Sequence, residues 1–184
     1  GEREGAFSKE YADELENMGI MYSHHDLDSS LIYFSQALDI LSSLDSENDI
    51  AVAQLLANMA GAYTQLEKYD LAMESNSEAL TLLLKLDRPR LNEIRAQVWK
   101  TIIVTEIKSG EVRDSPNALA SLTQWSEQTI VNSFYGMSQQ ERSLVWRSLN
   151  DFIQLAVHLA FVDASNGSLA SLAFDGLLVG KSML

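Results

Sequence analysis

Few residues of this chain could do acid–base, nucleophilic or metal chemistry, and their spacing does not bring them together. The 184 residues include no cysteine, which excludes disulfides, thiolate metal sites and a cysteine nucleophile among them. His24 and His25 are adjacent, so they would not share a helix face, and no third ligand stands at metal-binding spacing. A place in a turn is the simpler interpretation. His158 lies in an otherwise apolar helical pattern, which favours a core or groove position over that of a catalytic base.

The short motifs of known catalytic sites are also missing from the sequence. It contains no phosphate-binding glycine loop, no HExxH and no nucleophile elbow. The serines stand at expected helix ends and polar faces, where their local hydrogen bonding is ordinary. The sequence therefore predicts no catalytic residue, no metal site and no cofactor within these residues.

Two asparagines are better candidates for binding than any residue is for catalysis. Asn17 and Asn58 are 41 residues apart, and each precedes a methionine by one residue and a tyrosine by five. A carboxamide both donates and accepts hydrogen bonds, which suits it to a binding role. The alternative is that both are ordinary solvent-exposed polar residues. Their repetition at this spacing favours a role in binding.

Charge is distributed unevenly along the chain. The formal net charge is −13, and no Lys or Arg stands between Lys9 and Lys68, whereas basic residues predominate from Lys85 to Arg113. The negative net charge disfavours nucleic-acid binding. The acidic first part could attract a basic partner, or it could be a solvated surface that keeps the chain soluble. The longest uncharged stretch, residues 50–66, is too polar and too short to span a membrane.

Helical periodicity continues through most of the chain, which has only 2 prolines and 9 glycines. Pro89 is expected to end a helix near Leu86, and Gly110 suits the end of another. Ser115 is predicted to be an N-cap, with Pro116 at the first helical position. The expected helices cover residues 7–23, 27–41, two segments between 48 and 86, 91–109, 116–131, a long segment after the capping box at 138–141, and 169–179.

The stretch from Leu56 to Ala79 combines large and small residues in an order that repeats upstream. Met18, Gly19 and Tyr22 correspond to residues that lie 41 positions later, namely Met59, Ala60 and Tyr63. Phe34 and Ala37 then stand in the second helix of the first unit, as Ala72 and Ala79 do in that of the second. This order resembles the tetratricopeptide repeat, whose usual period is about 34 residues. Asn76 departs from the pattern, since the family prefers a large apolar residue there.

The resemblance to tetratricopeptide proteins implies an all-α fold, a right-handed superhelix of about three helical hairpins followed by two C-terminal helices. The repeats would occupy residues 1–133, with two clear units at 7–43 and 48–86 and a degenerate one at 90–133. In such a superhelix the first helix of each hairpin faces a concave groove. The resemblance therefore implies that a peptide or protein partner, basic if the acidic residues attract it, binds at Asn17, Tyr22, Asn58 and Tyr63.

Residues 138–184 resemble the segment that joins such repeats to a CHAT domain, a caspase-like cysteine peptidase domain, in bacterial proteins. The residues that carry this resemblance are Glu141, Arg142, Trp146, Ala173, Phe174, Asp175, Leu178, Lys181 and Leu184. Ser182 departs from it, because the family often has glycine there. The resemblance implies that the chain is the regulatory N-terminal part of such a peptidase, whose catalytic histidine and cysteine would follow Leu184. The alternative is a stand-alone adaptor or a signalling sensor with no enzyme attached.

The last expected helix, residues 169–179, is apolar on nearly every side. One stripe would pack on the preceding helix, and Phe174, Leu178 and Val179 are predicted to dock a downstream domain or to self-associate in its absence. The opening residues, GEREGAF, lack a methionine and an apolar signal core, so we expect further chain before Gly1 as well as after Leu184. Cysteine usage does not fix the compartment, although the bacterial cytoplasm is preferred over the periplasm.

Overall fold

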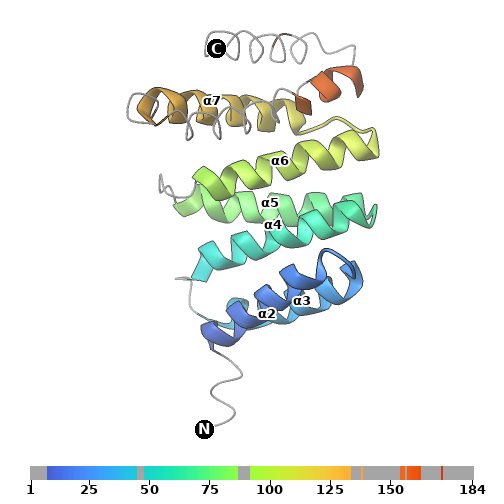
Figure 1. Ribbon diagram of the computed structural model, residues 1–184, viewed down its shortest axis with the longest axis vertical. Coiled ribbons are helices and arrows are strands. Elements are labelled where there is room, and N and C mark those ends of the chain that lie inside the picture. Colours follow the sequence, from blue (N-terminus) through green and yellow to red (C-terminus); the bar gives the residue numbers. More distant parts are fainter. Residues whose placement is uncertain are drawn as a thin grey trace. The chain divides into compact units, whose positions relative to one another are not determined.

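The computed structural model describes residues 8–44, 48–86, 92–133, 138, 154–155, 157–162 and 171 (Figure 1). Within these ranges the secondary structure is helical, and no strand occurs. The helices with defined bounds are α2 (Lys9–Tyr22), α3 (Leu27–Ser43), α4 (Asp49–Gln65), α5 (Tyr69–Leu86), α6 (Asn92–Ser109) and α7 (Ser115–Ser133). The prediction of an all-α fold built from helical hairpins is confirmed.

The chain divides into two compact units, Gly1–Thr101 and Ile102–Leu184. In the first unit each helix packs on the next one along the chain, α2 on α3, α3 on α4 and α4 on α5 (Figure 1). We call α2 with α3 the first hairpin and α4 with α5 the second hairpin. The expected end of a helix before Pro89 is confirmed, because α5 ends at Leu86.

Side-chain caps explain where the two helices of the first hairpin begin. The Ser8 hydroxyl accepts a hydrogen bond from the backbone N–H of Tyr11 at 3.3 Å, and the Asp26 carboxylate accepts one from that of Ser29 at 3.1 Å. The Ser29 hydroxyl also donates to Asp26, at 2.6 Å. Together the hydrogen bonds from Ser29 lower the pKa of the Asp26 carboxyl. The turn between α2 and α3 is therefore fixed by local hydrogen bonds.

Gly19 is the point of closest approach between α2 and α3. A Cβ atom at Gly19 would overlap ring carbons Cδ1 and Cε1 of Phe34, whose side chain is almost fully buried. The Ser30 hydroxyl, on the same helix as Phe34, donates to the Gly19 carbonyl oxygen at 2.8 Å. The missing side chain therefore lets an aromatic ring and a buried hydroxyl reach the backbone of α2.

The turn of the second hairpin is a Schellman motif. Glu67 has a φ of 59°, the left-handed conformation that ends many helices. The backbone N–H of Lys68 donates to the Tyr63 carbonyl at 2.9 Å, and that of Glu67 donates to the Thr64 carbonyl at 3.3 Å. These bonds satisfy carbonyl groups that have no partner within α4. They also set the direction in which the chain enters α5.

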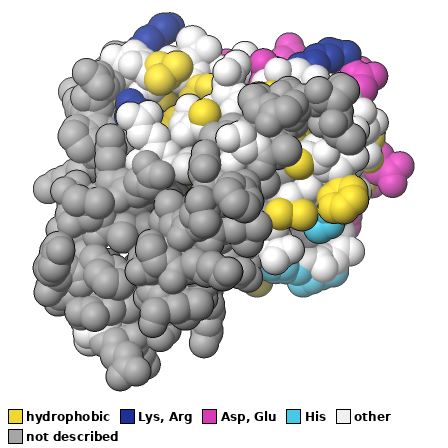
Figure 2. Space-filling view, turned by 90° about the horizontal axis from the view of Figure 1, so that it is seen from above, with side chains coloured by type: hydrophobic (Ala, Val, Ile, Leu, Met, Phe, Trp, Pro, Cys, Tyr) yellow, Lys and Arg dark blue, Asp and Glu magenta, His cyan; other side chains and the backbone are white. Residues whose placement is uncertain are grey.

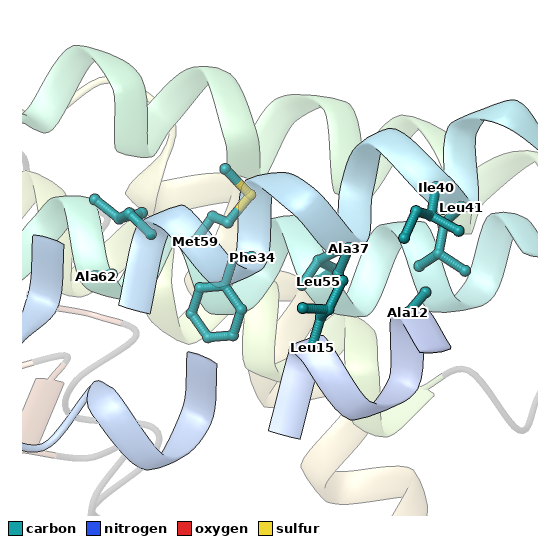
Figure 3. Close-up of a cluster of buried hydrophobic side chains, with 10 residues drawn as sticks. Ala12, Leu15, Phe34, Ala37, Ile40, Leu41, Leu55, Met59 and Ala62 are labelled. Atoms are coloured by element: carbon teal, nitrogen blue, oxygen red, sulfur yellow. The ribbon is translucent and has the colours of Figure 1, made fainter. Parts of the chain in front are cut away.

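One cluster of buried apolar side chains joins the two hairpins (Figure 3). Leu15 of α2 and Phe34 of α3 belong to it, and so do Leu55, Met59 and Ala62 of α4. Phe34 and Leu55 are at most 2% exposed, so these side chains are removed from water almost completely. Because the cluster takes side chains from three helices, each hairpin buries its apolar face against the other, as stacked repeats do.

Arg95 connects α6 to the end of α5 within the first unit. Its guanidinium Nη2 donates to the Leu83 carbonyl oxygen at 2.6 Å. That carbonyl belongs to the last turn of α5, where backbone acceptors have no intrahelical partner and the helix dipole favours a cation. The bond therefore satisfies a helix end that the sequence left without an obvious cap.

In the second unit a buried carboxylate organises the turn between α6 and α7. Glu106 accepts hydrogen bonds from the backbone N–H groups of Arg113, Asp114 and Ser115 at 2.8, 2.7 and 2.9 Å, and also from the Ser115 hydroxyl. Gly110, with a φ of 76°, ends α6 as expected. Helix α7 begins at Ser115, one residue earlier than predicted, because Glu106 and not Ser115 satisfies the N–H groups at its start.

Asn76 of α5 is fully buried, and neither its Nδ2 nor its Oδ1 atom has a hydrogen-bond partner in the described part of the chain. It stands 42 residues after Phe34, at the same place in the second hairpin. The neighbouring positions differ in a matching way, because Ala60 occupies the place of Gly19. The second hairpin thus has a methyl group where the first has none, and a small amide where the first has a ring.

Replacing Asn76 with leucine is expected to raise the free energy of unfolding by about 1–3 kcal/mol, since burying a polar group without a partner costs about that much. Urea denaturation followed by circular dichroism measures the change. Asn17→Leu, at an exposed position on α2, is the control and should change the stability by less than about 0.5 kcal/mol. An Asn76→Leu protein no more stable than the original would show that the amide is satisfied in solution.

Candidate functional site

Helices α2 and α4 present side chains of the same register on their exposed sides. On α4 these are Gln54, Asn58 and Gly61, and a Cβ atom at Gly61 would meet open space. Each stands 41 residues after its counterpart on α2, and the spacing of four and three residues puts each set on one helix face. We call this set the Asn17–Asn58 face, and it consists of Asp13, Asn17, Ile20, Gln54, Asn58 and Gly61.

The two asparagines of this face have different surroundings. Asn17 is exposed, whereas Asn58 is half-buried and its Nδ2 atom donates to Oε1 of Glu16 on α2 at 2.9 Å. The bond connects the two hairpins across 42 residues of sequence. The Asn58 amide is therefore held in one orientation by the first hairpin, and its carbonyl oxygen remains an acceptor.

Glu16 is a partly desolvated carboxylate beside a second acidic group. Burial raises the pKa of the Glu16 carboxyl and the charge of Asp13 raises it further, while the hydrogen bond from Asn58 and the charge of Lys9 act in the opposite direction. The Lys9 ammonium pairs with Asp13 at 2.8 Å. A cation brought to this face would stabilise the ionised form of Glu16, because opposite charge favours the charged state.

Both predicted tyrosines take part in packing within the first unit. Tyr22 is half-buried and stacks on Tyr33, with 5.2 Å between the ring centroids. The ring centroid of His25 lies 6.4 Å from that of Tyr22. Tyr63 is half-buried against the apolar cluster shared by the hairpins. A contact between these rings and a partner stays a prediction.

The histidines lie at the surface. His24 and His25 are exposed in the turn after α2, and Figure 2 shows histidine side chains next to apolar ones on the molecular surface. His158 is also exposed, so it is not a core residue, and a groove position stays a prediction. The apolar helical pattern around it places Leu159 in the interior instead. Among the described residues, no three histidine, aspartate or glutamate side chains come close enough to hold a metal ion.

The predicted docking residues Phe174, Leu178 and Val179 lie outside the described residues. So do all nine positions that carry the resemblance in residues 138–184. No helix in the described ranges is both long and apolar enough to cross a membrane.

Sequence reasoning did not single out Glu16. In the sequence Glu16 is one of many acidic residues of the first hairpin. Its bond to Asn58 could not be predicted, because the bond depends on how the two hairpins stack. The sequence did contain one signal, because Glu16 takes the register position of Ala57 in the next hairpin. A long acidic side chain stands there in place of a small apolar one.

No protein-family model matches the chain, and no curated protein is similar to it.

Proposed function

We propose that this chain is a tetratricopeptide-like interaction module that binds an extended peptide along the Asn17–Asn58 face. The observation that supports this most directly is the repeated asparagine at one register of two stacked hairpins. In the second hairpin its amide is fixed by Glu16 at 2.9 Å. A carboxamide held in place loses less conformational entropy on binding than a free one, and so recognises a backbone more favourably.

The charge of the first hairpin supports a basic partner. Asp13 and Glu16 lie on or beside the Asn17–Asn58 face, and among the described residues Lys9 is the basic residue that acts on Glu16. A peptide with Lys or Arg would be attracted over several ångströms and would supply the missing positive charge. Exposed acids are screened beyond about 8–10 Å at moderate salt, so this attraction weakens as salt rises.

Asn58→Ala should weaken peptide binding by about five- to tenfold, as expected for the loss of one hydrogen bond worth about 1 kcal/mol. The probe is the tightest binder from a library of extended peptides that carry Lys or Arg at fixed positions, measured by fluorescence anisotropy. Glu16→Asp is the matched control, because it keeps the negative charge and the Asn58 amide but shortens the side chain that bonds the two hairpins.

The two variants separate binding from packing. If Asn58 contacts the peptide, Asn58→Ala weakens binding more than Glu16→Asp does, while both lower the melting temperature by similar amounts. Equal losses of affinity would mean that Asn58 acts only through the stacking of the hairpins. If no peptide of the library binds, the proposed peptide-binding function is wrong.

We propose further that the module regulates or positions a caspase-like CHAT peptidase domain encoded beyond Leu184. The alternative is a stand-alone adaptor or signalling sensor. Reading the coding sequence beyond Leu184 distinguishes them. An α/β stretch with a histidine followed by a cysteine supports the peptidase, whereas a stop codon favours the adaptor.

A further inference from the structure

Helix α2 exposes a second set of side chains, at positions that the next hairpin buries. These are Tyr11, Met18 and Met21, which are 41, 37 and 64% exposed. With Glu14 they follow a spacing of three, four and three residues, so they form one stripe along the helix. We call the four residues the α2 stripe.

The counterparts of the α2 stripe on α4, 41 residues later, are Val52, Leu55, Met59 and Ala62. Leu55, Met59 and Ala62 are at most 6% exposed, and all four pack in or against the cluster that joins α4 to the first hairpin. On α4 this stripe is therefore the surface that contacts a neighbouring helix, namely α3. The α2 stripe continues that interface in register, but no described helix covers it.

Charge indicates which kind of helix would cover the stripe. Glu14 stands at the position of Leu55, and Glu10 lies one turn before it, so the stripe is apolar with acidic residues in and beside it. A second copy placed symmetrically on α2 would bring these carboxylates together, which is unfavourable. A helix with apolar residues on one side and Lys or Arg beside them would bury the apolar side chains and pair with Glu14.

We infer that the α2 stripe is a docking surface for a basic amphipathic helix, a partner distinct from the extended peptide proposed for the Asn17–Asn58 face. The helix would present apolar residues at spacings of three and four, as helices that lie against an apolar surface do. Its position would correspond to that of α3 on α4. The inference stands on the register of α2 and α4 and does not require the proposed function.

The test uses two synthetic helical peptides of equal length. Both carry Leu along one face, and one has Lys and the other Glu at the flanking positions. Anisotropy titrations with the full chain should show the Lys peptide binding at least about tenfold more tightly than the Glu peptide. Met21→Asp should lower the affinity for the Lys peptide by about tenfold, because it replaces an apolar contact by a charge. Glu14→Lys should reverse the preference.

Ile32→Asp is the matched control, since Ile32 is 57% exposed on α3, outside the stripe. It should leave both affinities within about twofold. Circular dichroism of each variant should match that of the original chain, because the altered side chains are exposed. Three results would overturn the inference: neither peptide binds, Met21→Asp binds the Lys peptide normally, or the chain forms a dimer that Met21→Asp abolishes. The last result would assign the stripe to a second copy.

Discussion

Replacement of Gly19 by alanine is expected to lower the free energy of unfolding by about 1–3 kcal/mol, the usual cost of overpacking a core. The direction of this change is informative, because alanine is a better helix former than glycine by about 1 kcal/mol. Helix propensity alone would therefore stabilise the Gly19→Ala protein. The new methyl group would overlap the ring of Phe34, which is 2% exposed and cannot move into solvent without leaving the core. Urea denaturation followed by circular dichroism measures the change.

Gly61→Ala is the matched control, because it makes the same substitution in α4 where a Cβ atom meets nothing within 4 Å. It should raise the stability by about 0.5–1 kcal/mol through helix propensity alone. Adding Phe34→Leu to Gly19→Ala should recover part of the loss, and the double-mutant cycle gives the coupling between the two sites. Two alanine variants with effects of the same sign would show that the contact between Gly19 and Phe34 does not limit the packing.

The helices could be predicted from sequence because their signals are local. The apolar period, Pro89 and Gly110 indicate where helices run and end, and the observed ends at Leu86 and Ser109 agree with them. The 41-residue register of Met18 and Tyr22 with Met59 and Tyr63 predicted two equivalent hairpins. It also placed Asn17 and Asn58 at equivalent positions on α2 and α4.

The contacts between helices could not be predicted, since they depend on how elements far apart in sequence stack. Glu16 and Asn58 are separated by 42 residues, and nothing local indicates their bond. The repeat pattern showed that Asn76 is unusual at its position. It did not show that the amide is buried without a partner among the described residues. Nothing local indicates the role of Glu106, because the backbone N–H groups that donate to it lie seven to nine residues away in a turn.

Glu106→Ala is expected to destabilise the chain by about 2–4 kcal/mol, since hydrogen bonds to a charged group contribute about 1.5–3 kcal/mol each and several are lost together. The carboxylate is 3% exposed and accepts from three consecutive backbone N–H groups and from the Ser115 hydroxyl. Ser115 is fully buried, so water cannot easily replace its lost acceptor. Hydrogen exchange should report faster exchange first at the amides of Arg113, Asp114 and Ser115.

Glu111→Ala is the control within the same turn. Glu111 is exposed, and among the described residues its carboxylate pairs with the side chain of Arg113, so its loss should cost less than about 0.5 kcal/mol. Glu106→Gln keeps one carbonyl oxygen and should fall between the two alanine variants. If Glu106→Ala and Glu111→Ala unfold at the same urea concentration, the buried carboxylate does not hold the start of α7, and the N–H groups of that turn find other acceptors. If Glu106→Ala alone is destabilised and its amides exchange faster, one side chain of α6 determines where α7 begins.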